Sequence, residues 1–508
     1  MVKSIGLEGM KGYEIVVEAD VRTDREQCVI IGLPDTSMKE SRERILANLY
    51  ALDFDLALKR ITIQLSPSDK RKNGIGFDCA MLLAVLMKIM PEPIRIDEQT
   101  CILGGLSLKG EIMPFDGLVP SIQQALQMNF KRIIVPPIDT SFLPLNDEIE
   151  IVTVETVKQL LDYFTGQLSL QMIRLHHIQK VRETEMDLQQ EEVQPIDFSM
   201  IYGHEKAKRA LEIAAAGGHH VLMSGPPGCG KTMLAEAFQT IIPPLSDEQM
   251  LETYSIYHLA KMPRSFSKGA PYRAPHHSSS AISLIGGGTY PKPGEISLAH
   301  NGVLFLDELG EFSKKTLDML RQPLEKGEVT ISRVRQSVTY PSRFLLIAAT
   351  NPCPCGYAGS HERYCNCTPK QIQQYQQKVS GPLFDRMDFF LSLKSMPFQQ
   401  HQSAEKSVDI RKRVEQARNI QLQRANGLNG ALPNSALREH CQIDQKTFHL
   451  LQQHCFANKW SNRTQMKILR IARTIADLAQ AQQIEKEHLL EAIAWKELAP
   501  ATLEKAYA

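Results

Sequence analysis

A glycine-rich segment at residues 225–232 constrains the fold of this chain more than any other feature. It reads GPPGCGKT and matches the pattern G-x-x-x-x-G-K-[ST] at every fixed position. The apolar run HVLM at residues 220–223 precedes it and predicts a strand, while residues 231–242 have the spacing of a helix. A strand, a glycine-rich loop and a helix in this order indicate a phosphate-binding loop in a parallel α/β sheet.

The residue types in this loop suit a nucleoside triphosphate bound with Mg²⁺. Backbone N–H groups of a glycine-rich loop at a helix N-terminus bind phosphates. Lys231 would contact the β- and γ-phosphates, and the hydroxyl of Thr232 would bind Mg²⁺. A turn with a chance lysine is the alternative, which the flanking strand and helix disfavour. The other expected nucleotide-binding residues are Gly225, Pro226, Pro227, Gly228, Cys229 and Gly230.

Length and composition are those of a multidomain protein with ordinary cores. The chain has 508 residues, of which 43% are hydrophobic and 23% charged, and this length predicts about three domains. The net charge of +1 argues neither for nor against a polyanionic partner, so nucleic-acid contacts would have to come from local patches. No stretch approaches about 18 uninterrupted apolar residues and the N-terminus has no signal-peptide core, so we expect a cytoplasmic protein without a membrane partner.

The residue pattern divides the chain into four parts. Residues 1–170 mix short strands with helices and predict an α/β domain. Residues 171–197 are polar and predict a linker, with a solvated helix as the alternative. Residues 198–395 alternate strands and helices around the phosphate loop, and residues 396–508 are almost entirely helical. In the first part we expect strands at 14–20, 27–31 and 60–65 and helices at 37–52 and 77–90.

A second motif supplies carboxylates. Residues 303–306, VLFL, predict a buried parallel strand that ends in Asp307 and Glu308. Asp307 would hold Mg²⁺, directly or through water, and Glu308 would act as general base on the attacking water. An acidic pair on the surface is the alternative.

A third apolar strand, residues 344–350, delivers Asn351 to the same edge of the sheet. An amide there can orient the attacking water beside the γ-phosphate. Taken alone, Asn351 would more often be a turn residue before Pro352.

The order of these motifs resembles that of the AAA+ ATPases, and most closely the magnesium-chelatase-like subgroup that contains the ComM/YifB proteins. The further matching strings are AAAGGH at 214–219, APHH at 274–277, PGEISLAHNG at 293–302 and GPLFDRMD at 381–388. The resemblance implies an AAA+ core with a helical lid, ATP and Mg²⁺ as ligands, and a homo-hexameric ring.

The resemblance also implies roles for two arginines. Arg386 matches the arginine finger, which reaches into the ATP site of the neighbouring subunit; a salt bridge to Asp385 or Asp388 is the alternative. Arg463 matches the sensor-2 arginine, which contacts the γ-phosphate in its own subunit. Arg470 on the same helix is the weaker candidate for that role.

Two segments could hold DNA. The small, flexible stretch at 278–289 resembles the helix-2 insertion of this AAA+ branch. Residues 328–340 alternate on both sides of a polar centre, predict a β-hairpin, and lie where the branch carries its pre-sensor-1 hairpin. Arg333 and Arg335 would then contact DNA phosphates without sequence preference, although exposed charges on a structural hairpin are an equal alternative for either arginine singly.

Four cysteines lie close together in the sequence just after Asn351. They are Cys353, Cys355, Cys365 and Cys367. Four thiols within 15 residues suggest a structural Zn²⁺ site in a reducing compartment, with unliganded loop cysteines as the alternative. His361 could replace one ligand.

The amino-terminal part resembles the Lon-protease-type domain, which has a ribosomal protein S5-type α/β fold. The matching strings are LSPSDKRKNGIGFD at 65–78 and GGLSLKGEIMPFDGL at 104–118. Gly76 stands where the catalytic serine of Lon enzymes would lie and Ser121 where the lysine would lie, so we expect no peptidase activity. Lys70, Arg71 and Lys72 form a basic turn that would suit phosphates, with a solvated surface run as the commoner outcome.

The resemblance implies a ring-forming DNA motor, a helicase or branch-migration translocase in homologous recombination that integrates DNA during natural transformation. An ATP-dependent chaperone or unfoldase, or a magnesium-chelatase-type remodelling ATPase, is the alternative. The Lon-like domain and the cysteine cluster argue against a chelatase subunit, and Gly76 and Ser121 argue against a protease.

Overall fold

The computed structural model divides the chain into two compact units. It describes residues 1–32, 36–70, 72, 75–91, 93–138, 149–167, 196–262, 264, 267–288, 291–333, 336–359, 363–379, 381–395 and 405–497. Most of the predicted linker, Arg71, Arg335 and His361 lie outside the described residues. The first unit comprises residues 1–192 and 246–267, and the second comprises residues 193–245 and 268–508.

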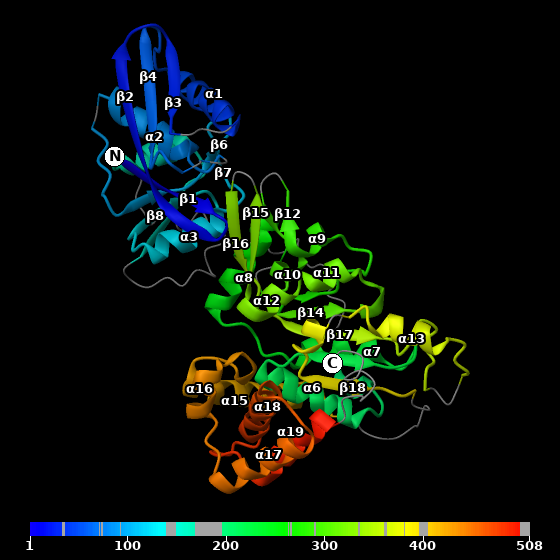
Figure 1. Cartoon of the computed structure of the whole chain (residues 1–508). Helices are drawn as coiled ribbons and strands as arrows, with labels where there is room; N and C mark the ends of the chain where they lie inside the picture. Colours follow the sequence, from blue (N-terminus) through cyan, green and yellow to red (C-terminus); the bar gives the residue numbers. More distant parts are fainter. Residues whose placement is uncertain are drawn as a thin grey trace. The chain divides into compact units, whose positions relative to one another are not determined.

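The first unit is built on one mixed sheet with the strand order β3-β4-β2-β1-β5-β8-β9 (Figure 1). Strands β1, β2 and β4 pair antiparallel, and the remaining neighbours pair parallel. The strands are β1 (Val2–Glu8), β2 (Lys11–Thr23), β3 (Gln27–Ile31), β4 (Lys59–Ser66), β5 (Thr100–Ile102), β8 (Arg132–Val135) and β9 (Glu150–Thr153), with a small hairpin of β6 (Gly105–Leu106) and β7 (Ile112–Met113). The expected strands in this part of the chain are confirmed, although β2 is longer than predicted.

The helices that the structure describes between residues 1 and 167 are α1 (Thr36–Ala51), α2 (Asp78–Ile89), α3 (Leu118–Gln127) and α4 (Val157–Phe164). The first two confirm the predicted helices. Helix α2 is apolar on all sides and is buried from Asp78 to Leu86, which is the pattern of a helix enclosed by a core. The α/β class predicted for this part of the chain is therefore correct.

A helix from beyond the phosphate loop completes the first unit. Helix α8 (Asp247–Ala260) begins at a capping box of Ser246 and Gln249, and its Leu251 is buried in the same apolar cluster as α3. The backbone N–H of Gly117 donates to Nδ1 of His258 at 3.0 Å. The structure therefore groups residues 246–267 with the first unit, whereas the sequence pattern placed them with the phosphate loop. The reason is apolar packing against α3, which no local pattern reveals.

The second unit is built on five parallel strands in the order β11-β14-β17-β10-β18 (Figure 1). The strands are β10 (Val221–Ser224), β11 (Tyr272–Arg273), β14 (Val303–Leu306), β17 (Leu345–Thr350) and β18 (Phe389–Ser392). The helices of this part of the unit are α6 (Glu205–Gly217), α7 (Lys231–Phe238), α9 (Ala281–Ile285), α10 (Glu295–Leu298), α11 (Lys314–Asp318), α12 (Arg321–Lys326), α13 (Pro369–Gln376) and α14 (Gly381–Phe384). Short 3₁₀ helices are η2 (Phe198–Met200), η3 (Gln239–Ile241) and η4 (Leu309–Glu311).

The carboxyl-terminal part of the second unit is helical, as predicted. It consists of α15 (Ser407–Ala425), η5 (Asn429–Ala431), α16 (Asn434–His440), α17 (Gln445–Ala457), α18 (Asn462–Leu478) and α19 (Lys486–Glu497). Buried residues of these helices share one apolar cluster with α6, α7 and the parallel sheet. Inside it Asp477 accepts hydrogen bonds from Arg424 and Arg473, and Thr474 pairs with His219 at 2.9 Å. Satisfied buried polar groups of this kind fix one arrangement of the elements they join.

Two small hairpins stand outside the parallel sheet. Strands β15 (Glu328–Arg333) and β16 (Gln336–Pro341) pair antiparallel, so the predicted β-hairpin is confirmed. The other hairpin, β12 (Gly286–Gly287) with β13 (Lys292–Pro293), lies in the predicted insertion. The hydroxyl of Tyr340 donates to the carbonyl of Pro291 at 2.7 Å, which joins the two. In the part of the chain that the structure describes, no helix is long and apolar enough to cross a membrane.

Candidate nucleotide-binding site

The ends of three neighbouring strands bring the predicted site residues together. Strand β17 lies between β10 and β14, and all three run in the same direction. The residues that follow them are Gly225 after β10, Asp307 after β14 and Asn351 after β17. The carboxyl edge of a parallel sheet is the place where α/β proteins bind ligands. The structure therefore puts the phosphate loop, the acidic pair and the amide at one edge.

Backbone conformation explains the glycines of the phosphate loop. Gly228 and Gly230 have φ angles of 77° and 88°, in the left-handed region that favours glycine. A Cβ at either would meet no atom within 4 Å, so conformation rather than space requires glycine there. At Gly225 space is decisive, because a Cβ would lie 2.7 Å from the sulfur of Cys229. The loop leads directly into α7, whose first residue is Lys231.

Lys231 lies at the centre of the site. Its ammonium group donates to the carbonyls of Gly225 at 2.8 Å and Pro226 at 2.9 Å, and to Oδ1 of Asn351 at 3.2 Å. The side chain is 9% exposed. Because these three acceptors are neutral oxygens, they do not cancel the positive charge, which can attract an anion such as a phosphate.

The next residue along α7 meets the acidic motif. The hydroxyl of Thr232 donates to Oδ2 of Asp307 at 3.0 Å, and the other oxygen of Asp307 accepts the backbone N–H of Glu308 at 2.8 Å. A hydroxyl and a carboxylate are the hard oxygen ligands that Mg²⁺ prefers when it also binds phosphates. The donor set therefore fits Mg²⁺ delivered with a nucleotide.

Glu308 has a partner that local sequence patterns do not reveal. Its φ angle is 49°, and its carboxylate lies 3.1 Å from Nδ1 of His277. The ring of His277 packs against that of His276, with the centroids 4.0 Å apart. His277 belongs to the string APHH at residues 274–277. This string served only for the family resemblance, and His277 was given no role at the site. His277 is therefore a site residue that sequence reasoning missed, because more than 30 residues separate it from its partner.

Arg386 follows α14 and pairs within the chain with Glu325 of α12. A salt bridge within the chain is the alternative predicted for Arg386. The salt bridge is present, but its partner is Glu325 and not Asp385 or Asp388. Its Nη1 atom is buried and has no hydrogen-bond partner among the residues that the structure describes. A guanidinium with one unused donor has capacity for a further acceptor.

The two arginines predicted on the last long helix differ in their surroundings. Arg463 lies in the first turn of α18, is about half exposed, and is 3.4 Å from a carboxylate oxygen of Asp385. Arg470, by contrast, donates to the carbonyl of Leu432 at 2.8 Å and to Asn434 at 2.7 Å. Arg470 therefore holds helical segments together, and Arg463 is the arginine left facing solvent beside the LFDRMD segment.

A buried polar cluster fixes the strand that carries the phosphate loop. The backbone N–H of Leu346 donates to Nδ1 of His220 at 3.1 Å, and the N–H of His220 donates to Asp388 at 3.2 Å. Burial lowers the pKa of the His220 imidazole from its ordinary 6.5 to about 4. Burial acts to raise the pKa of Asp388, but its hydrogen bond to His219 and the charge of Lys467 outweigh burial and hold that pKa well below its usual range.

The second unit is therefore expected to lose stability as the pH falls from about 6.5 to about 4. In this window the unfolded chain protonates His220 and the folded chain does not, so unfolding takes up a proton and becomes easier as the pH falls. His220→Asn keeps an acceptor for the N–H of Leu346 without titrating, and should flatten that part of the curve. Denaturant unfolding followed by tryptophan fluorescence reports on this unit, because Trp460 and Trp495 both lie in it.

The control is His449→Asn, which changes an exposed histidine of α17. This variant should keep the wild-type dependence on pH. Parallel curves for the wild type and His220→Asn would contradict the role given to His220.

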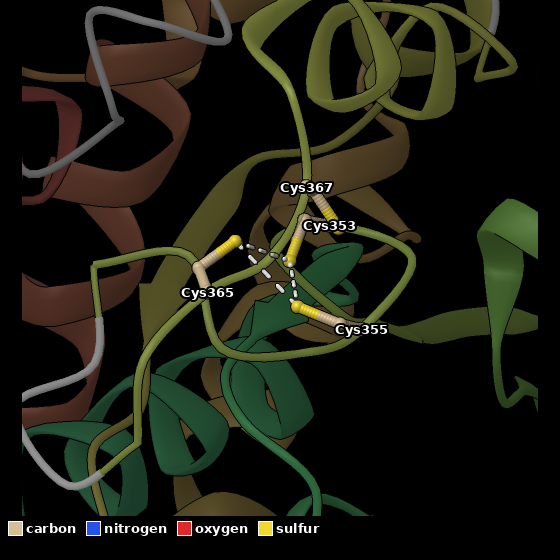
Figure 2. Close-up of side chains that lie close together, drawn as sticks. All are labelled: Cys353, Cys355, Cys365 and Cys367. Carbon is tan, nitrogen blue, oxygen red and sulfur yellow. Dashed lines mark hydrogen bonds between the residues drawn. The ribbon is translucent and has the colours of Figure 1, made fainter.

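The four cysteines predicted to bind metal do come together (Figure 2). Their sulfur atoms all lie within 4.8 Å of one another. Cys353 is buried, and the other three are partly exposed. Hydrogen bonds lower the pKa of Cys355 to about 6. The largest effect comes from the backbone of Tyr357 and the next from the thiol of Cys353.

In the first unit the space beside Gly76 is filled. A Cβ at this residue would lie 2.6 Å from Cε2 of Phe115. Ser121 is fully buried on α3.

The predicted basic turn is corrected by the structure. Lys72 is fully buried and donates to the backbone carbonyls of Pro67 and Lys70, so it does not face a ligand. Lys70 lies over the ring of Tyr13, 4.2 Å from its centroid. Neither lysine is a free surface cation.

Comparisons with known proteins agree along most of the chain. Residues 197–401 match the family described as magnesium chelatase, subunit ChlI, and residues 404–496 match the family of its C-terminal part. Residues 17–139 match the family described as subunit ChlI of Mg-chelatase. The Lon-like domain was taken from the sequence as evidence against a chelatase subunit. That interpretation is wrong, because this part of the chain itself matches a chelatase family.

Individual relatives cover almost the full length. The chain is 36% identical over 495 residues to competence protein ComM of Haemophilus influenzae, which covers 96% of this chain and 95% of that protein. It is 35% identical over 495 residues to the uncharacterized protein YifB of Escherichia coli, with the same coverage. A shorter match, 31% identical over 108 residues, joins it to an archaeal Lon protease of Methanocaldococcus jannaschii and covers 21% of this chain and 16% of that protein. The chain belongs to the ComM/YifB family of magnesium-chelatase-like ATPases.

Proposed function

We propose that this protein is an ATP-driven motor that assembles as a homo-hexameric ring and moves along DNA. Its work would be helicase or branch-migration activity in homologous recombination, in the integration of DNA taken up by natural transformation. The observation that carries the proposal is the meeting of Lys231, Thr232, Asp307 and Asn351 at one edge of the parallel sheet. The name of the Haemophilus relative, a competence protein, supports the setting.

Each residue at that edge has a task in ATP hydrolysis. Lys231 would neutralise charge on the β- and γ-phosphates, and Thr232 and Asp307 would hold Mg²⁺. Glu308 would accept the proton of the attacking water, and Asn351 would orient that water. In the structure the carboxylate of Glu308 lies 3.1 Å from Nδ1 of His277, and this contact would hold it back from the attacking water. Such a position would keep the site inactive until a partner draws the carboxylate back.

The arginines support the proposed ring. Arg386 would stabilise charge on the γ-phosphate of a neighbouring subunit, and Arg463 would act on the nucleotide of its own chain. The unused donor of Arg386 is buried in the single chain, so the arginine would leave Glu325 to meet a phosphate oxygen of the neighbouring subunit.

The β15–β16 hairpin is the segment proposed to touch DNA. One face packs inward through Val329, Ile331, Val338 and Tyr340, which are all buried. The other face is polar and carries the side-chain pairs Thr330–Thr339 at 3.1 Å and Ser332–Ser337 at 3.2 Å. The apolar face holds the hairpin against the predicted insertion, where the hydroxyl of Tyr340 donates to the carbonyl of Pro291. The polar face is left for a ligand. Arg333 is the last residue of β15, and Arg335 lies outside the described residues. Together these two cations would meet backbone phosphates.

Replacing Arg333 and Arg335 together by alanine should weaken DNA binding about tenfold and reduce the salt slope by about two, because each arginine contributes one phosphate contact. ATP hydrolysis without DNA should be unchanged, since neither residue belongs to the nucleotide site. DNA affinity by fluorescence anisotropy at several salt concentrations measures both effects. Lys314→Ala with Lys315→Ala, an exposed pair on α11, is the matched control. Equal losses in both double variants would contradict a specific role for the hairpin.

The decisive experiment compares ATP hydrolysis with and without DNA and then follows branch migration on four-way junctions. Stimulation of hydrolysis by DNA and ATP-dependent movement of the branch are expected, and Lys231→Ala should lose both. Hydrolysis without either response to DNA would favour the alternative, a chaperone or a chelatase-type remodelling ATPase, for which the chelatase family match is the supporting observation.

A further inference from the structure

The cysteine cluster is a group of reactive side chains that the hydrolysis chemistry does not use. It consists of Cys353, Cys355, Cys365 and Cys367, which lie on the segment between β17 and α13 (Figure 2). The sulfur of Cys353 lies 3.3 Å from that of Cys355 and 3.7 Å from that of Cys365, and the last two are 3.5 Å apart.

These separations fit one ion and no disulfide. A disulfide would bring two sulfurs to about 2.05 Å, and all four cysteines are free. Four thiolates around one tetrahedral zinc at about 2.3 Å lie about 3.8 Å from one another. A soft, all-sulfur tetrahedral set favours Zn²⁺, and four protein ligands leave no position open for a reacting molecule. The site is therefore structural in type.

The backbone around the cluster is arranged like the surroundings of a bound metal. The N–H of Ala358 donates to the sulfur of Cys353 at 3.2 Å. Gly356 and Gly359 have φ angles of 85° and 75°, which let the chain turn back between the two cysteine pairs. Hydrogen bonds from N–H groups to sulfur stabilise thiolates and orient them as ligands.

Two contacts connect the cluster to the nucleotide site. Cys353 follows Asn351 by two residues, and Asn351 accepts the hydrogen bond from Lys231. Gly356 presses on the phosphate loop, since a Cβ there would lie 2.6 Å from Cδ of Pro227. On the far side of the cluster, Gln376 of α13 donates to the carbonyl of Pro352 at 3.2 Å. The segment that the cysteines close thus touches both the amide and the loop.

We infer that the four cysteines bind one zinc ion, and that this ion positions Asn351 and the phosphate loop for hydrolysis. Binding displaces the thiol protons and ties the two C-x-C pairs together. Without zinc, weak thiol contacts to Cys365 join the two pairs among the described residues, and Asn351 would be held less firmly beside Lys231. The role in hydrolysis rests on the proposed ATPase function, whereas zinc binding stands apart from it.

The first test counts metal. The full chain, purified without added metal, should contain one zinc per chain by mass spectrometry of the elements, and Cys365→Ser with Cys367→Ser should contain almost none. Cys367→His, which offers another zinc ligand, should keep the zinc. In the cobalt-substituted protein the absorption bands of a tetrahedral thiolate site should appear. Cys28→Ala, a change of a buried cysteine in the first unit, is the control. Less than a tenth of an equivalent of zinc in the wild type, or iron in its place, would overturn the assignment.

The second test separates positioning from folding. Loss of zinc should lower kcat for ATP about tenfold, the lower end of the effect of losing a group that orients the residues of a site. It should change KM less than threefold. Releasing zinc from the wild type with a mercurial should lower kcat by the same factor, and restoring thiols and zinc should recover it, so the test holds even if the serine variant fails to fold. A zinc-free protein with full kcat would overturn the positioning role. If wild-type protein with one zinc hydrolyses no ATP, the proposed function fails and the zinc site remains.

Discussion

Glu308→Gln is expected to slow ATP hydrolysis by about 10²- to 10⁴-fold, the usual contribution of a general base, and to leave ATP affinity nearly unchanged. The amide keeps the shape of the side chain at the end of β14 but cannot accept a proton from water. Lys231, Thr232 and Asp307 do not involve this carboxylate in their contacts, so nucleotide binding should persist. Single-turnover hydrolysis and binding of a fluorescent ATP analogue measure the two effects separately.

Glu311→Gln is the matched control for this change. Glu311 is an exposed glutamate three residues further along the chain, and its carboxylate lies 3.7 Å from Lys378. It should hydrolyse ATP at the wild-type rate. Hydrolysis by Glu308→Gln within about threefold of wild type would mean that another group activates the water, and His277 would be the first residue to replace.

Arg386→Ala should reduce hydrolysis by about 10³-fold or more, by analogy with fingers that act on GTP. If the arginine serves the neighbouring subunit, the loss can be reversed by mixing. Lys231→Ala is inactive at its own site but still carries Arg386. A mixed ring of the two variants therefore contains sites with an intact Lys231 facing an intact Arg386. Hydrolysis by the mixture, measured over a series of ratios, should exceed that of either variant alone.

The ion pair inside the chain supplies the control. Glu325→Gln removes the partner that Arg386 has in the single chain and leaves the arginine in place, so activity should be retained. If Glu325→Gln loses as much activity as Arg386→Ala, and mixing recovers nothing, Arg386 acts through this pair and not across a subunit boundary.

Local patterns in the sequence were sufficient for the strands and loops of the candidate site. The apolar run before Asp307 and the one before Asn351 each predict a buried strand, and the glycines of residues 225–230 predict the loop. Parallel strands end at a common edge, so three correct local predictions were enough to bring Lys231 and Asn351 together. The hairpin at 328–341 was predictable for the same reason, because alternation and turn are properties of adjacent residues.

What the sequence could not provide depends on contacts between distant segments. His277 meets Glu308, Arg386 meets Glu325, and α8 meets α3 through packing that leaves no periodic trace. Lys72 shows a different kind of error. A run of three basic residues is usually solvated, but here the ammonium group of Lys72 is buried and donates to the backbone carbonyls of Pro67 and Lys70. Burial of a charge is set by the surrounding fold, not by its neighbours in sequence.

Helix α8 has a consequence for how the chain is made. Ribosomes synthesise a protein from its amino terminus, and domains generally fold in that order as they emerge. The first unit, however, includes residues 246–267, which are translated after the phosphate loop. Between the end of α3 at Gln127 and the start of α8 at Asp247, about 120 further residues are added, which takes roughly 6 to 24 seconds at ordinary rates of synthesis. The apolar surface of α3 that packs against α8 stays uncovered during that time. The first unit is therefore not complete until part of the second has been made.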